Sequence, residues 1–71
     1  MKNEFLLWMY DTLIGGQVVE RKLFCAENKI SERTFYRYMR AISVFLIRHK
    51  SDLVVDVREP MGEYYIKKSN G

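Results

Sequence analysis

The sequence predicts a small, mainly α-helical domain that ends in a β-hairpin, with its elements in the order α-β-α-α-β-β. Two observations support this fold class. Apolar residues recur at helical spacing through the first two thirds of the chain, and the last third changes to β-branched and aromatic runs around a turn. The chain has 71 residues, of which 48% are hydrophobic and 30% charged, so it suits one domain with one core.

The first helix is expected over residues 3–14, because Phe5, Trp8 and Leu13 recur at helical spacing. Its apolar side chains cover more than one stripe, so the helix needs more than one surface to bury against. We therefore expect Trp8 in the core or at an interface. The Gly15-Gly16 pair ends the helix, since glycine adopts the left-handed conformation without a Cβ penalty.

A helix-turn-helix is expected next. Residues 17–19 are short and β-branched and predict a brief strand, and residues 20–27 predict the second helix. Asn28 favours the turn, because asparagine tolerates left-handed backbone better than most residues. Ser31 is a suitable N-cap for the third helix, which we expect to run to about Leu46.

The C-terminal segment predicts a hairpin. The run 53–57 is rich in valine, the turn 58–62 contains a proline and a glycine, and the run 63–67 is β-prone again. Because side chains alternate along a strand, Tyr64 and Tyr65 are expected on opposite faces, one in the core and one exposed.

The net charge of +3 is distributed unevenly along the chain. Residues 1–20 carry a net charge of −2, residues 21–50 carry +6, and residues 51–71 carry −1. No acidic residue lies between Arg33 and Lys50. A local positive field of this kind attracts polyanions such as nucleic acid.

The third helix separates two kinds of side chain at 100° per residue. One face carries Arg33, Tyr36, Arg37 and Arg40, and the opposite face carries Phe35, Tyr38, Met39, Ile42 and Leu46. An α-helix fits the major groove, where arginine binds guanine edges or phosphates. Ser31 and Thr34 lie near the helix start, where hydroxyl and N–H groups often bind phosphate oxygens. The alternative interpretation is a solvated basic surface.

Residues 30–39, Ile-Ser-Glu-Arg-Thr-Phe-Tyr-Arg-Tyr-Met, resemble the recognition-helix signature of DeoR-type and WYL-type winged helix-turn-helix regulators. The run 62–66, Gly-Glu-Tyr-Tyr-Ile, is similar to the strand that follows the wing in that family. Lys29 stands where the family usually has a turn glycine. The resemblance covers about residues 5–67.

The resemblance implies a winged helix-turn-helix over residues 1–68, and we expect residues 69–71 to be a disordered tail or linker. It also implies sequence-specific binding of double-stranded DNA in transcription regulation, with the helix of about residues 31–46 in the major groove and the hairpin as the wing. Arg58, the basic residue at the wing tip, is the first candidate for a contact between the wing and DNA. The expected DNA-binding residues are Lys29, Ser31, Arg33, Thr34, Tyr36, Arg37, Arg40 and Arg58.

The sequence also allows partners other than DNA. An exposed face of Leu6, Tyr10 and Ile14 would suit a protein-interaction or assembly module, and structured RNA is a third candidate ligand. Because DNA operators are commonly two-fold, we expect a homodimer through the first helix, with Val44 and Ile47 as further apolar surface.

We expect no enzymatic activity, no cofactor and no metal site. His49 has no second histidine or Cys/His spacing around it, and Cys25 lies among apolar residues as a small buried side chain. A single cysteine closes no disulfide within the chain, so with the family resemblance we expect a cytoplasmic protein of a bacterium or phage. No membrane partner is expected, because the longest apolar run near the N-terminus, residues 5–10, is too short to span a bilayer.

Overall fold

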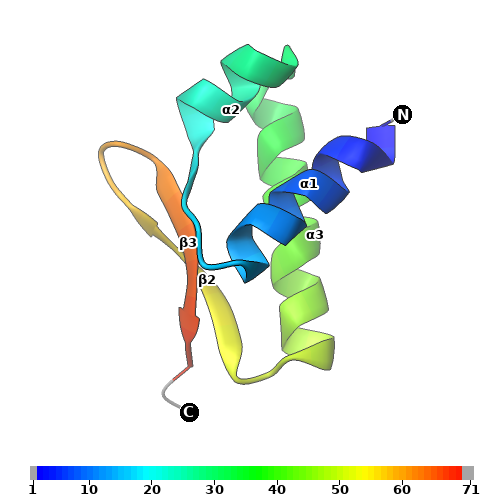
Figure 1. The fold of residues 1–71 in the computed structure, drawn as a ribbon, viewed down its shortest axis with the longest axis vertical. Coiled ribbons are helices and arrows are strands. Elements are labelled where there is room, and N and C mark those ends of the chain that lie inside the picture. The colour runs from blue at the N-terminus through cyan, green and yellow to red at the C-terminus, as the bar shows by residue number, and fades with distance from the viewer. Residues whose placement is uncertain (1, 70–71) are drawn as a thin grey trace.

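The computed structural model describes residues 2–69, with the side chains from Glu4 onward. The chain forms a small α+β domain of three helices and a three-stranded antiparallel sheet (Figure 1). Its elements are α1 (Lys2–Ile14), β1 (Val19–Glu20), α2 (Arg21–Asn28), α3 (Glu32–His49), β2 (Leu53–Arg58) and β3 (Glu63–Lys68). This confirms the order predicted from the sequence.

The end of α1 determines where the first strand begins. The N–H of Gly16 donates to the carbonyl oxygen of Leu13, and the N–H of Gln17 donates to that of Thr12. This pair of bonds closes the helix with Gly16 at φ +86°, as the sequence predicts. Because the N–H of Gln17 is used by the helix end, the strand predicted over 17–19 is displaced to Val19–Glu20.

Strand β3 lies at the centre of the sheet, between β1 and β2. Val19 of β1 pairs with Tyr64, and Val55 of β2 pairs with Ile66. The N–H of Ser69 donates to the carbonyl oxygen of Asp52 (2.7 Å), so this residue continues the hairpin. Residues 70–71 of the expected tail lie outside the described residues.

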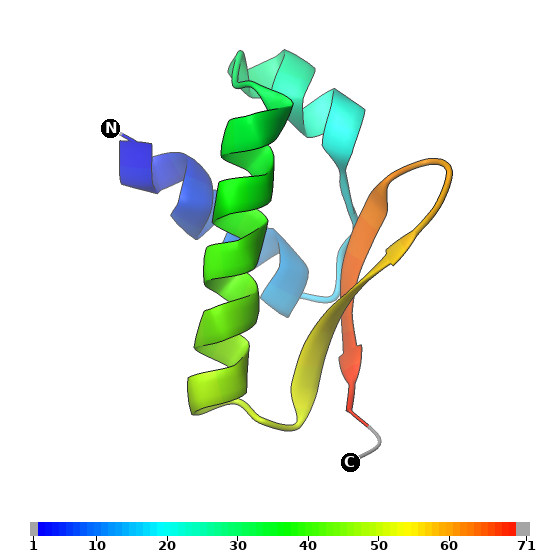
Figure 2. The same cartoon turned by 180° about the vertical axis from the view of Figure 1, so that it is seen from behind.

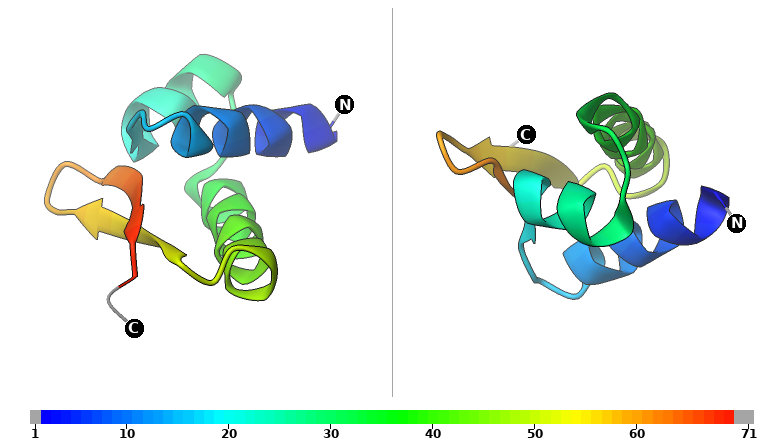
Figure 3. Two further views of the ribbon diagram at one scale, coloured as in Figure 1. Left: turned by 60° about the horizontal axis from the view of Figure 1, so that its bottom comes forward. Right: turned by 90° about the horizontal axis from the view of Figure 1, so that it is seen from above.

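The helices lie to one side of the sheet (Figure 3), and the core lies between them and that face of the sheet. Its buried side chains are Met9, Leu13, Val19, Phe24, Phe35, Met39, Ile42 and Leu46. Phe35 of α3 is fully buried, with its ring 5.8 Å from that of Phe24 and 5.3 Å from that of Tyr64. Tyr64 therefore packs against the core, and Tyr65 lies on the opposite face with Asp56 and Arg58, as strand alternation predicts, although Tyr65 is half-buried and not fully exposed.

The turn between α2 and α3 differs from the prediction in one residue. Lys29 takes the left-handed conformation (φ +54°), so the assignment of that conformation to Asn28 is wrong. The side-chain amide of Asn28 donates to the carbonyl oxygen of Phe24 (2.9 Å), which keeps Asn28 as the last residue of α2. Helix α2 therefore begins and ends one residue later than the predicted range 20–27.

Helix α3 begins where the sequence predicts, with Ser31 as its N-cap. It is longer than predicted and ends at His49 instead of about Leu46. The N–H of Lys50 still donates to the carbonyl oxygen of Leu46 (2.8 Å), and the basic residues of the last turn suit the negative end of the helix dipole.

The apolar residues of α1 divide into two groups. Trp8 is 52% exposed, and its ring lies 5.6 Å from the Phe24 ring, so it covers the core from outside. Leu6 and Tyr10 are partly buried against the core, so the prediction of an exposed face is wrong for these two residues, and only Ile14 of that face is exposed. Leu6 and Tyr10 are covered because α3 crosses this side of α1.

Candidate nucleic-acid interface

Helix α3 lies at the front of the molecule in Figure 2, and its predicted basic face is exposed. Phe35, Met39, Ile42 and Leu46 are buried on one side of the helix, so the residues on the opposite side cannot also be buried. Arg33, Arg37 and Arg40 are all exposed on that opposite side. Within residues 2–69 none of these three guanidinium groups forms an ion pair, so their charge is available to a ligand.

At the start of α3 the side-chain hydroxyl groups of Ser31 and Thr34 form a hydrogen bond with each other. The Oγ of Ser31 accepts from the backbone N–H of Thr34 (3.1 Å), and its own O–H donates to Oγ1 of Thr34 (3.1 Å). Ser31 therefore has its main role as the helix cap. The O–H of Thr34 stays free to donate to an anionic oxygen, although this side chain is half-buried.

Lys29 brings a further positive charge to the same end of α3. The Lys29 side chain is exposed, and the backbone of Lys29 forms the turn that leads into the Ser31 cap. The N-terminal part of α3 therefore combines a cation with the helix dipole, whose positive end attracts anions.

Tyr36 is 44% exposed and is held by a residue that the sequence analysis did not single out. Its hydroxyl oxygen accepts a hydrogen bond from Nη1 of Arg21 (3.0 Å), and the Arg21 Cζ lies 5.9 Å from its ring centroid. Arg21 thus holds the hydroxyl end of this half-exposed side chain.

Arg21 also contacts the loop of the β2–β3 hairpin. The backbone N–H of Arg21 donates to the carbonyl oxygen of Gly62 (2.9 Å). A Cβ atom at Gly62 would lie 3.2 Å from the Cζ of Arg21. Glycine thus allows the loop to approach this closely. The loop lies toward the same end of the molecule as α2 and the start of α3 (Figures 1 and 2).

The sequence does contain a signal for Arg21. Arg21 and Lys22 open α2, where the helix dipole disfavours positive charge. Two cations in this position are unusual unless another interaction or a ligand compensates. The tertiary contact with Tyr36, however, joins positions 15 residues apart and has no local pattern.

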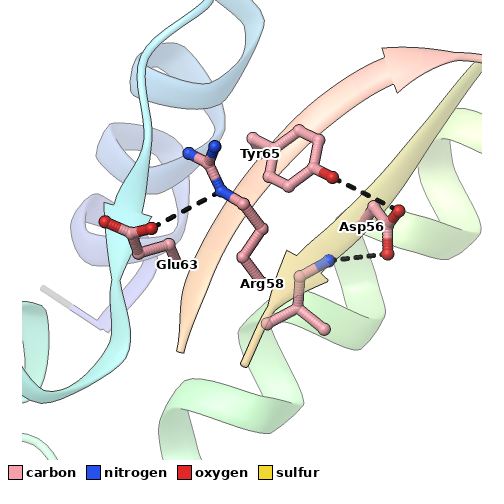
Figure 4. Close-up of polar contacts among 5 residues, drawn as sticks. Asp56, Arg58, Glu63 and Tyr65 are labelled. Atoms are coloured by element: carbon pink, nitrogen blue, oxygen red, sulfur yellow. Dashed lines mark hydrogen bonds and ion pairs between the residues drawn. The ribbon is translucent and has the colours of Figure 1, made fainter. Parts of the chain in front are cut away.

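The outer face of the hairpin is more nearly neutral. Nε of Arg58 lies 3.5 Å from Oε1 of Glu63, and its Cζ lies 5.1 Å from the ring centroid of Tyr65 (Figure 4). The side chain remains 60% exposed. Arg58 is therefore accessible, as predicted, but part of its charge is offset by a carboxylate on the neighbouring strand.

Asp56 forms a second polar cluster on the same face. Oδ2 of Asp56 accepts from the Tyr65 hydroxyl (3.4 Å), and Oδ1 accepts from the N–H of Val57 (2.8 Å) (Figure 4). Oδ2 also lies 2.8 Å from Nζ of Lys67. The hydrogen bond from Lys67 is the largest cause that lowers the pKa of Asp56. The cluster holds the two strands together and leaves little free charge.

Cys25 and His49 are two further side chains with reactive groups. Burial raises the pKa of Cys25, which disfavours the nucleophilic thiolate. The ring of His49 lies 4.7 Å from that of Phe45, at the end of α3. In the described part of the chain, no group of three or more His, Cys, Asp or Glu residues could hold a metal ion.

Comparison of the chain with protein-family models, curated proteins and solved structures finds no match. None of the helices in residues 2–69 is long and apolar enough to cross a membrane.

Proposed function

We propose that the chain is a winged helix-turn-helix domain that binds double-stranded DNA sequence-specifically and regulates transcription. The observation that supports this most directly is the row of exposed, unpaired guanidinium groups on α3, opposite its buried face. In this proposal α2 and α3 are the helix-turn-helix, α3 enters the major groove, and the β2–β3 hairpin is the wing.

Each group in the interface has a separate role. Arg33, Arg37 and Arg40 bind guanine edges or phosphates, because their fork of donors matches both. Lys29 and the hydroxyl of Thr34 bind phosphate at the start of α3. Tyr36 contributes a partly exposed side chain whose hydroxyl group Arg21 holds in place.

The wing contributes little affinity in this proposal. Arg58 is its one predicted contact, and the nearby Glu63 carboxylate reduces the attraction to phosphate. The affinity therefore depends mainly on α3 and on the turn before it.

The proposal is tested by measuring binding of duplex DNA over a series of salt concentrations, after selection of a preferred sequence from random oligonucleotides. We expect log K to fall linearly with log salt, with a slope of about −0.9 for each phosphate contacted. No binding at low salt would contradict the proposal. Tighter binding of structured RNA in competition would favour RNA as the ligand instead.

A matched pair of variants tests the site itself. Arg37→Ala should weaken binding of the preferred duplex by about 1–3 kcal/mol if Arg37 contacts a base. Lys68→Ala removes the same charge from the exposed end of β3 and should change the affinity much less. Equal effects of the two variants would mean that only net charge matters and would remove Arg37 from the site.

A further inference from the structure

An apolar groove of about 260 Å³ lies between α1 and α3. It is lined by Leu6, Leu7, Tyr10, Ala41, Ile42 and Phe45. At 100° per residue, Phe45 lies about 120° around α3 from Arg33 and about 80° from Arg37, so the groove opens beside the arginine face.

Two of the apolar side chains that line the groove are well exposed. Leu7 is 64% exposed and Phe45 42%. Adjacent exposed apolar side chains of this size are typical of surfaces that bind another macromolecule.

The two rims of the groove carry opposite charges. Asp11 lies one helical turn after Leu7 on α1, and Arg48 lies one turn after Phe45 on α3. Both side chains are exposed, and neither forms an ion pair within the described residues.

We propose that this groove is the interface with a second copy of the chain, related by a two-fold axis. In a two-fold interface the same patch serves both partners, so α1 of one copy lies against α3 of the other. The negative rim of each copy then faces the positive rim of its partner, and the apolar side chains of both fill the space between.

A dimer of ordinary size would cover only a small part of each copy. A stable interface buries about 800 Å² from each partner, which is roughly one seventh of the 5333 Å² surface of this chain. The groove and the exposed residues beside it extend along two helices. Arg48 lies about 20° around α3 from Arg37, so the interface borders the C-terminal end of the arginine face, whereas Arg33 and Arg37 lie about three or more helical turns before Arg48. The inference rests on the groove and its charges and not on DNA binding.

The oligomeric state of the full chain tests the inference by sedimentation velocity over a concentration series. We expect the dimer fraction to rise across about 1–100 µM. Leu7→Glu should weaken the dimer by at least about tenfold, because it places a charge in the apolar interface. Leu23→Glu is the matched control, since Leu23 is similarly exposed (54%) but lies on α2.

Charge exchange provides a test that a folding defect cannot imitate. Asp11→Arg and Arg48→Glu should each weaken the dimer, because like charges then face each other across the interface. The double variant restores opposite charges and should recover most of the association. Circular dichroism melts of the four proteins show whether each variant is folded.

Three results would overturn the inference. They are a wild-type chain that stays monomeric throughout the series, loss of the dimer in Leu23→Glu with retention in Leu7→Glu, and no recovery in the folded double variant. Binding to a DNA duplex long enough for one copy only is measured in parallel. It should be unchanged in Leu7→Glu, so failure of the dimer and failure of DNA binding are distinguishable.

Discussion

Lys29 combines a backbone conformation that suits glycine with an exposed positive charge. A left-handed conformation costs an ordinary L-residue about 1–2 kcal/mol, and Lys29 has φ +54°. Strained positions of this kind cluster at functional sites, which agrees with a role for the side chain in phosphate binding.

Lys29→Gly should therefore separate stability from binding. We expect the variant to be more stable by about 0.5–1 kcal/mol, because relief of the left-handed strain exceeds the added entropy of the unfolded chain. Its DNA affinity should fall, with a salt slope smaller by about 0.9 if one phosphate contact is lost. Urea denaturation and the duplex titration measure the two effects.

Lys29→Ala is the control, because it removes the charge and keeps the backbone strain. It should lose as much DNA affinity as Lys29→Gly without the gain in stability. Wild-type affinity in both variants would exclude Lys29 from the interface.

Asp56 makes the stability of the hairpin dependent on pH. Its pKa is lowered in the folded chain, chiefly by the hydrogen bond from Lys67, relative to about 3.9 in an unfolded chain. The folded state therefore favours the ionised carboxylate. The resulting stability is fully present above the unfolded pKa and is lost as the pH falls through the lower folded pKa.

We expect the difference in free energy of unfolding between wild type and Asp56→Asn to be constant near neutral pH and to shrink below about pH 4. Urea denaturation at several pH values measures it. A difference that stays constant down to the lowest pH would mean that the carboxylate charge contributes nothing to the hairpin.

At the scale of elements, the Ser31 cap determines where α3 begins. Ser31→Ala removes the acceptor of the Thr34 N–H and should destabilise the domain by about 1 kcal/mol. Ser31→Asp keeps an acceptor and should retain most of the stability, while its negative charge should weaken DNA binding. Thermal and urea unfolding with the duplex titration give both quantities. Equal stability of wild type and Ser31→Ala would contradict a role as cap.

The elements with local signals could be predicted from the sequence. The buried stripe of α3 follows a helical period, Ser31 marks its start, and the valine run 53–57 with its proline-containing turn marks the hairpin. The position of β1 could not be predicted as well, because it depends on the hydrogen bonds that end α1 and on pairing with Tyr64.

The candidate site divides in the same way. Helical periodicity alone indicates the face of Arg33, Arg37 and Arg40, and the structure leaves all three exposed. It does not indicate that Arg21 contacts Tyr36, or that Glu63 offsets Arg58, because both are tertiary contacts.

At the scale of the whole molecule, the segregation of charge along the chain becomes a segregation of surfaces. The segment with a net charge of +6 includes α3, whose arginine face is outermost, and the hairpin carries paired charges. The groove beside them depends on how α1 crosses α3, which no run of residues in the sequence specifies.

Arg21 has a consequence for the flexibility of the proposed interface. Through its N–H and its guanidinium group it joins the hairpin loop at Gly62 to Tyr36 on α3. The helix and the hairpin are thus fixed relative to each other before any ligand binds. A preorganised surface loses less conformational entropy on association than one that must fold around its partner. Such a domain would select duplexes whose groove width already matches the spacing of its parts.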